Sequence, residues 1–146
     1  MKTKSIFAFM LGLLLLCDTA FAMDKQMKIT QNDLPVKAQE FLTNHFAQSV
    51  VKKVVKSTAD DGVEVFFVTF KDKTRIEFDM VGAWSVITVK KDSVSDEVMP
   101  VRIRSVLRTN YAGKNIKMAD NDGVHFHFVF DDKSEVRVNI FGEIME

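Results

Sequence analysis

Two stretches of the chain repeat the same order of residues, and this repeat constrains the fold more than any other feature. The first spans residues 62–84 and the second spans residues 123–144. Each is typical of a β-hairpin followed by a turn into another strand, with glycines at the turns and apolar residues alternating between them. At one constant offset the matched pairs are Phe70 and Phe130, Asp72 and Asp132, Lys73 and Lys133, Ile76 and Val136, Phe78 and Val138, and Gly82 and Gly142.

A helical pattern precedes each stretch. Asn32 and Asp33 can cap a helix and Pro35 suits its first turn, where Pro100 later repeats Pro35. Apolar residues then recur at helical spacing: Leu34, Ala38, Phe41, Leu42 and Phe46, and again Met99, Ile103, Val106, Leu107 and Tyr111. The sequence therefore predicts two units of helix–β–β–β–β, at about residues 32–90 and 97–146, after a short flexible lead over residues 23–31.

A unit of this size cannot close a hydrophobic core well by itself. We therefore expect residues 23–146 to form a single domain in which the strands of both units join into one antiparallel sheet. The two helices are expected on one face of that sheet, which is an α+β architecture.

Alternation along the predicted strands assigns the two faces of the sheet. Ile76, Phe78 and Met80 share one face of their strand. The core under the helices is predicted from the phenylalanine side of each hairpin, with Phe66, Val68, Phe70, Ile76, Phe78, Phe126, Phe128, Phe130, Val136 and Val138. We expect Trp84 to close this core at the start of a strand rather than to serve as a ligand platform.

The opposite face is left open, and its central part is less polar than an exposed antiparallel face usually is. Val65 and Phe67 stand there in the first unit, and His125 and His127 take the same places in the second. One interpretation is partial cover by a loop, or simple tolerance of scattered apolar groups. The other is a partner-binding surface, for which the candidates are Val65, Phe67, Arg75, Glu77, His125, His127 and Arg137.

The N-terminus has the pattern of a targeting segment. Lys2 and Lys4 precede an apolar run over residues 6–16, and an Ala-Phe-Ala cleavage pattern ends at Ala22. We predict cleavage of residues 1–22, a periplasmic or secreted protein, and no transmembrane segment after cleavage. Lipidation at Cys17 is the alternative, which the three leucines before that cysteine disfavour. After cleavage the chain has no cysteine, so its core alone must hold the fold.

Composition and motifs exclude several classes of function. Twenty basic and twenty acidic residues cancel without forming a basic stripe, which argues against nucleic acid as a partner. No phosphate-binding, dinucleotide-binding or nucleophile-elbow motif occurs, so we expect neither an enzyme nor a cofactor. The aspartates near residues 120–132 fit turn chemistry better than a calcium loop.

His125 and His127 are weak candidates for a metal, because two strand histidines need a third or fourth ligand. We expect no metal at this position. The alternative function is nevertheless a small-ligand or metal-binding protein of the cell envelope that uses these two histidines.

Two motifs also resemble a known family. The pattern L-P-x-x-A-x-x-F-L-x-x-H-F over residues 34–46 and the pattern I-E-F-D-x-x-G-x-W over residues 76–84 are similar to the β-lactamase-inhibitor-like, PepSY-like family of exported bacterial proteins. The second unit departs from the pattern, with Arg137, Val138 and Asn139 in place of E-F-D and Ile144 in place of the tryptophan. The resemblance implies tandem α/β repeats and a non-catalytic binding or inhibitory module that recognises an exported or envelope protein.

Overall fold

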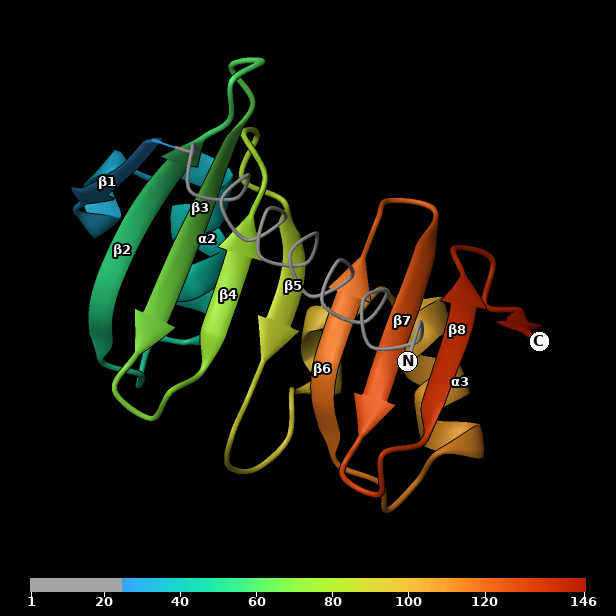
Figure 1. Cartoon of the computed structure of the whole chain (residues 1–146). Helices are drawn as coiled ribbons and strands as arrows, with labels where there is room; N and C mark the ends of the chain where they lie inside the picture. Colours follow the sequence, from blue (N-terminus) through green and yellow to red (C-terminus); the bar gives the residue numbers. More distant parts are fainter. Residues whose placement is uncertain (1–24) are drawn as a thin grey trace, which may run out of the picture.

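The computed structural model describes residues 25–146, which form one sheet with two helices against one of its faces (Figure 1). The predicted signal peptide lies outside the described residues. The strands are β1 (Lys25–Ile29), β2 (Val51–Thr58), β3 (Glu64–Phe70), β4 (Arg75–Phe78), β5 (Trp84–Thr88), β6 (Ile116–Asn121), β7 (His125–Phe130), β8 (Glu135–Asn139) and β9 (Ile144–Met145). The helices are α2 (Val36–His45) and α3 (Val101–Asn110), and single 3-10 turns, η2 (Gln31–Asp33) and η3 (Asp96–Val98), precede them.

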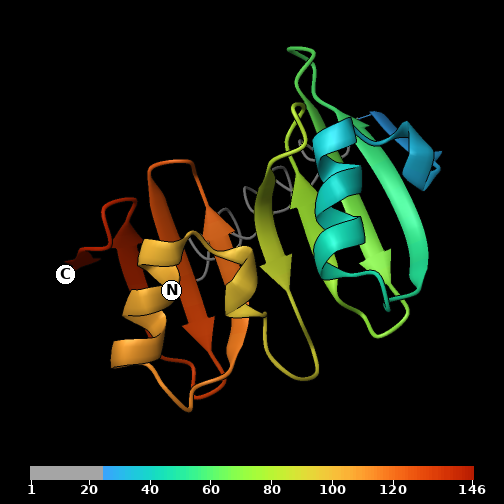
Figure 2. The ribbon, with the colours of Figure 1, turned by 180° about the vertical axis from the view of Figure 1, so that it is seen from behind.

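Every strand pairs antiparallel with the next strand in the chain, so the spatial order of the nine strands is their sequence order. The two halves join where β5 pairs with β6, from Val86 opposite Asp120 to Thr88 opposite Met118. Both views place α2 and α3 on the same face of this sheet (Figures 1 and 2). The predicted α+β class, with one antiparallel sheet and both helices on one side, is therefore confirmed. The tandem repeat itself stays an interpretation of the sequence.

Each helix begins directly after a proline, Pro35 or Pro100, and continues for ten residues. Proline suits the start of a helix, because a backbone nitrogen at this position donates no hydrogen bond within the helix and the proline nitrogen has no hydrogen to donate. The helices bury the faces that helical spacing predicts, with Ala38 and Leu42 in α2 and Ile103 and Leu107 in α3. At the C-terminal end of each helix an aromatic ring stacks on the sheet. Phe46 lies 5.3 Å from Phe70 and Tyr111 lies 5.2 Å from Phe130, measured between ring centroids.

The hydrophobic core lies between the helices and the sheet. All ten core residues predicted from strand alternation are buried, and each contributes about 1.5–3 kcal/mol through its burial. Trp84 is 8% exposed and packs against Phe126, which agrees with a role in the core. The prediction for Met80 was wrong. Its side chain is 59% exposed because β4 ends at Phe78 and Met80 lies in the following turn.

The prediction of a flexible lead over residues 23–31 was also wrong for the part that the structure describes. Lys25–Ile29 forms strand β1, which pairs with β2 from Lys25 opposite Thr58 to Ile29 opposite Val54. The segment shows no apolar alternation, because β1 is an edge strand and four of its five residues are exposed. The pairing of β1 with β2 therefore holds this segment as a strand, although its own sequence has no strand pattern.

Neither α2 nor α3 is long and apolar enough to cross a membrane.

Aspartates close the hairpin turns, as the sequence predicts. Asp72 accepts a hydrogen bond from the backbone N–H of Thr74, and Asp132 accepts one from Ser134, each at 2.9 Å. Hydrogen bonds from the Lys114 and Ser134 side chains hold the pKa of Asp132 far below its usual range. These carboxylates are therefore engaged in turn structure.

Gly82 lies in a turn that closely approaches the start of α2, and its replacement is a direct test of the helix packing. Its φ is +87°, and an added Cβ would lie 2.8 Å from the Ala38 nitrogen and 2.9 Å from the Pro35 Cβ. Gly62→Ala is a matched control, since Gly62 has a φ of +84° but no atom within 4 Å of the added carbon. We expect Gly62→Ala to lower the free energy of unfolding by about 1–2 kcal/mol. Gly82→Ala should cost about 1–3 kcal/mol more, because it adds overpacking. Equal losses in urea unfolding would contradict this packing.

Acid should weaken the fold partly through Asp122. Backbone hydrogen bonds from His125 and Val124, and one from the His125 ring, lower the pKa of Asp122 from 3.8 to about 2. The stabilisation is therefore complete above about pH 4 and is lost as the pH falls towards 2. We expect Asp122→Asn to flatten the fall in unfolding free energy over this range in urea titrations. An identical pH dependence in Asp122→Asn and the native protein would contradict the expectation.

Candidate functional site

The candidate site is the face of the sheet that the helices leave uncovered, which we call the open face. Strand alternation directs Val65, Phe67 and Thr69 of β3 to this face while their neighbours enter the core. Arg75 and Glu77 of β4 lie on the same side, as do His125 and His127 of β7 and Arg137 of β8. Each predicted partner-binding residue is therefore on the open face.

The strand register aligns the open face into a row that crosses the whole sheet. Consecutive members are direct cross-strand neighbours, so their side chains lie side by side. From β1 to β9 the row contains Lys28, Val55, Phe67, Glu77, Val86, Asp120, His127, Arg137 and Met145. Apolar, acidic and basic groups thus share one continuous surface.

The structure divides the predicted residues between two clusters. In the first, on β3 and β4, the Arg75 guanidinium lies 4.4 Å from the centre of the Phe67 ring in a cation–π contact. Val65 extends this cluster, and Glu77 accepts a hydrogen bond of 2.9 Å from the Ser85 hydroxyl. The second cluster, on β7 and β8, holds His125, His127 and Arg137.

Val86 of β5 and Asp120 of β6 lie between these clusters, and the sequence reasoning missed both. Simple alternation from buried Trp84 would send Val86 to the core. The pairing of β4 with β5 instead shifts by one residue between Glu77 and Phe78, so Val86 lies opposite Glu77 and Ile87 becomes fully buried. A β-bulge of this kind reverses the faces beyond it. The turn before Trp84 offered no sequence signal for it.

Each histidine of the open face has its own carboxylate partner. His127 Nε2 lies 2.9 Å from Glu135 Oε2, and His125 Nδ1 lies 3.2 Å from Asp122 Oδ2. No group of three or more histidine, cysteine, aspartate or glutamate side chains suited to a metal occurs within residues 25–146. The arrangement therefore consists of two separate pairs and does not converge on one point.

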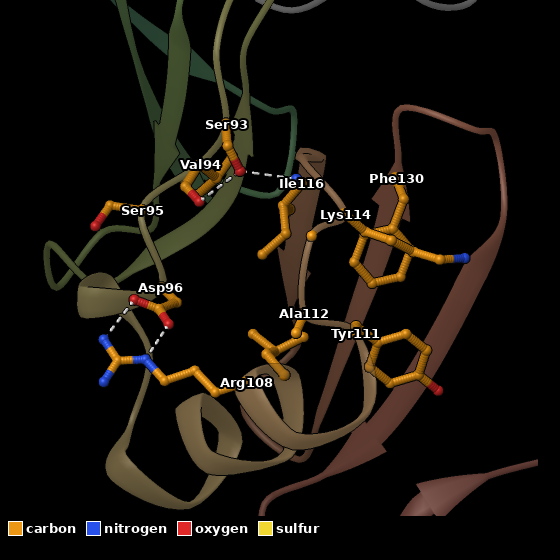
Figure 3. A pocket seen from close by; sticks show the side chains of 12 residues that line it. Ser93, Val94, Ser95, Asp96, Arg108, Tyr111, Ala112, Lys114, Ile116 and Phe130 are labelled. Carbon is orange, nitrogen blue, oxygen red and sulfur yellow. Dashed lines mark hydrogen bonds and ion pairs between the residues drawn. The ribbon is translucent and has the colours of Figure 1, made fainter.

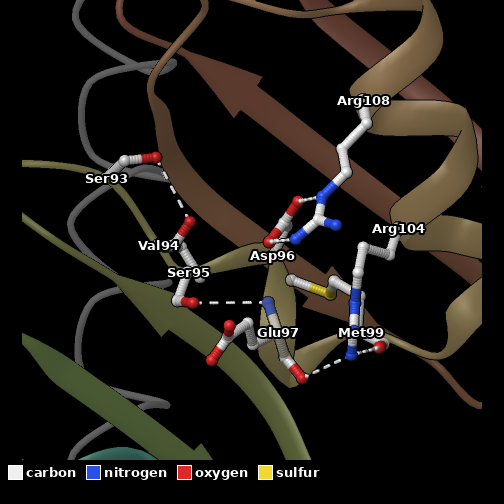
Figure 4. Close-up of polar contacts among 8 residues, drawn as sticks. All are labelled: Ser93, Val94, Ser95, Asp96, Glu97, Met99, Arg104 and Arg108. Atoms are coloured by element: carbon white, nitrogen blue, oxygen red, sulfur yellow. Dashed lines mark hydrogen bonds and ion pairs between the residues drawn. The ribbon is translucent and has the colours of Figure 1, made fainter.

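A pocket of about 370 Å³ lies on the helix side, between α3 and the segment that joins β5 to η3 (Figure 3). Leu107, Ile116 and Phe130 form its apolar lining. At its mouth Arg108 binds Asp96 through two hydrogen bonds of 2.6 and 3.1 Å (Figure 4). Lys114, also at the rim, binds Asp132 at 2.8 Å. The charged groups around this pocket are therefore already paired with one another.

The Arg108–Asp96 pair and a neighbouring arginine also anchor the connection between the two halves. Arg104 donates hydrogen bonds to the carbonyls of Glu97 and Met99, at 3.1 and 3.3 Å (Figure 4). Both arginines come from α3 and bind the η3 segment. The two arginines near the pocket therefore hold the η3 segment against α3.

Several solved structures share this fold. A protein described as a "putative calcium-regulated periplasmic protein" from Bacteroides thetaiotaomicron has a TM-score of 0.76 and 22% identity, over 83% of this chain and 94% of its own. A "putative periplasmic protein" from Bacteroides vulgatus has a TM-score of 0.77 and 23% identity, over 85% of this chain and 97% of its own. Another from B. vulgatus, of unknown function, has a TM-score of 0.75 and 24% identity, over 84% and 98%. At these identities the likeness shows the fold.

No curated protein matches the chain in sequence. A family model does match it, over residues 64–146, which is more than half of the chain. That model is described as "Putative beta-lactamase-inhibitor-like, PepSY-like". The matched part runs from β3 to β9 and so includes both clusters of the open face. The chain therefore belongs to the PepSY-like family of β-lactamase-inhibitor-like proteins.

Proposed function

We propose that this protein is an exported, non-catalytic module that binds a protein partner through its open face. The observation that supports this most directly is the row of neighbouring side chains from Lys28 to Met145, which no element of residues 25–146 covers. A continuous row of side chains that crosses the whole sheet has the breadth of a protein–protein interface.

The chemistry of the open face also suits a protein partner. Aromatic residues and arginines are enriched in protein interfaces and provide many of their strongest contacts. Phe67 is half-buried beneath Arg75, so the pair is ordered before a partner arrives. His127 and Arg137 offer basic groups beside Asp120, and the mixture of charge signs can set the orientation of a partner.

Two further observations support a non-catalytic role and export to the periplasm. The imidazoles of the open face each contact a carboxylate of an adjacent turn or strand, which is an ordinary contact between surface side chains. Three structural relatives are described as periplasmic proteins. Together with the targeting pattern of residues 1–22, this supports cleavage after Ala22 and residence in the periplasm.

Crosslinking from defined positions tests the open face. A photoreactive amino acid at Val65 should form an adduct with the partner in intact cells, and the same amino acid at Ser105 on exposed α3 should not. The double variant Phe67→Asp and His127→Asp should reduce the adduct at least about tenfold, because it removes an aromatic contact and introduces two charges. Val101→Asp, at an exposed position on α3, is the matched control and should leave the adduct intact. An undiminished adduct in a folded double variant would refute the proposed surface.

Titration with metals and heme separates this proposal from a small-ligand function. Each histidine pairs with one carboxylate, whereas zinc needs three or four ligands at one point. We therefore expect no saturable heat with zinc, copper or heme at micromolar concentrations. Saturable binding that is lost in the variant His125→Ala and His127→Ala would instead establish the small-ligand alternative.

A further inference from the structure

A groove of about 260 Å³ lies on the helix side of the sheet, where the two halves of the protein meet. One wall is a stripe of α2 with Lys37, Phe41 and His45, and the facing residues are Val98 of η3 and Asn121 of β6. Figure 2 shows this side of the sheet, with α2 and α3 on opposite sides of β5. We call this site the α2 groove.

Helical spacing produces the stripe on α2. Lys37, Phe41 and His45 follow one another at intervals of four residues, so they share one side of the helix. At a rise of about 1.5 Å per residue, Lys37 and His45 stand about 12 Å apart along the helix axis, with Phe41 between them. A ligand that reaches both therefore has a polar group at each end and an apolar middle.

Two aromatic rings give the α2 groove an ordered apolar surface. Phe41 makes an edge-on contact with Phe78, at 5.7 Å between ring centroids, and a tilted contact with His45 at 4.8 Å. Trp84 packs against Phe126 and is 8% exposed, so it keeps its place in the core while the exposed part of its indole reaches the groove. Both rings are therefore in place before a ligand binds, which lowers the entropic cost of binding.

The polar groups of the α2 groove suit an anion. None of the residues that line it is acidic, and within residues 25–146 neither Lys37 nor His45 forms an ion pair. Glu40, the acidic residue of α2, lines a pocket on another side of the helix. Asn121 is engaged already, since its amide donates a hydrogen bond of 3.3 Å to the carbonyl of Trp84. The Lys37 ammonium and an N–H of the His45 ring are thus available to a ligand.

This is the opposite of the pocket beside α3. There Arg108 and Lys114 already bind Asp96 and Asp132, so no positive charge is left for an anion. In the α2 groove the positive charge has no such partner.

The α2 groove is also where the two motifs of the sequence analysis meet. Phe41 and His45 belong to the first motif, and Gly82 and Trp84 belong to the second. Packing explains the buried Trp84 and the close turn at Gly82, whereas His45 is exposed. The fold therefore brings this exposed histidine next to the aromatic rings.

The two ends of the stripe differ electrostatically. Lys37 lies in the first turn of α2, where the positive end of the helix dipole also favours an anion. His45 lies in the last turn, at the negative end of the dipole. A carboxylate therefore fits the Lys37 end, and a neutral hydroxyl group fits the His45 end.

We propose that the α2 groove binds a small aromatic carboxylate that carries a neutral hydroxyl group at the far end of its ring. The ring packs on Phe41 and the exposed part of Trp84. The carboxylate bonds to Lys37 and the hydroxyl group to the ring of His45. The groove admits a single ring, because pockets for larger, drug-sized ligands have about 300–1,000 Å³. The site goes beyond the proposed protein binding and shares no residue with the open face.

Fluorescence tests the inference directly, because Trp84 is the only tryptophan in the sequence and lines the groove. In titrations of the purified protein, 4-hydroxyphenylacetate should change the Trp84 emission saturably at micromolar to millimolar concentrations. The alcohol 2-(4-hydroxyphenyl)ethanol has the same ring and hydroxyl group but no carboxylate. It should bind at least about tenfold more weakly, because hydrogen bonds between charged groups are the stronger ones. No saturable change, or equal affinities of the two compounds, would overturn the proposal.

Single substitutions assign the two ends of the ligand. Lys37→Gln should weaken the binding of 4-hydroxyphenylacetate at least about tenfold and leave that of the alcohol unchanged. His45→Phe keeps a ring beside Phe41 but removes the N–H. It should weaken 4-hydroxyphenylacetate about two- to tenfold and leave phenylacetate, which lacks the hydroxyl group, unchanged. Arg102→Gln, at the same position of α3 as Lys37 in α2, is the matched control and should have no effect.

Both substituted positions of α2 are exposed, so the variants should fold and any loss of binding is local. Native affinity in Lys37→Gln would overturn the proposal. Nuclear Overhauser effects should connect the ring protons of the ligand with Phe41, and effects only with residues outside the groove would overturn it as well. Phe67→Asp, on the open face, should leave ligand binding unchanged, so this site and the proposed protein interface succeed or fail separately.

Discussion

The packing of α2 and α3 against one face of the sheet determines which side chains reach the other face. Phenylalanines and aliphatic residues of the central strands are buried beneath the helices, and a slip of one residue in any strand would expose them. Burial at about 1.5–3 kcal/mol per side chain makes such a slip costly. Fixing the buried side chains therefore also fixes which side chains lie on the open face. Gly82 allows this packing, because its turn meets the start of α2 where a side chain would clash.

The two halves share this packing but differ where function is proposed. Val65 and Phe67 occupy the open face in the first half, and His125 and His127 occupy it in the second. Residues common to both halves maintain the scaffold. Residues that differ are the places where a partner could distinguish one end of the sheet from the other.

Membership of the PepSY-like family fits a binding module, but a shared fold is a weak guide to function. The proposal depends instead on the surface itself. Phe67 under Arg75 and the row of charged and apolar groups from Lys28 to Met145 lie on one uncovered face. The pocket beside α3 is less suited to a partner, because Arg108 and Lys114 at its mouth already bind Asp96 and Asp132.

Much of the fold followed from local pattern. Helical spacing after Pro35 and Pro100 predicted both helices, and period-two alternation predicted the buried face of the hairpins around Phe78 and Phe128. These features depend on neighbours in sequence, so the chain records them directly. The same alternation placed every candidate site residue on the open face.

The features that only the tertiary structure decided depend on pairing between strands. β1 is ordered by β2 although its own residues show no alternation, and the bulge between β4 and β5 brings Val86 to the open face and sends Ile87 to the core. The row that links Phe67 to His127 exists only because Val86 and Asp120 meet where the halves join. The sequence by itself determined the two helices and the inner and outer faces of the hairpins. Register and bulges were decided by the assembled sheet, because hydrogen bonds between strands distant in sequence set them.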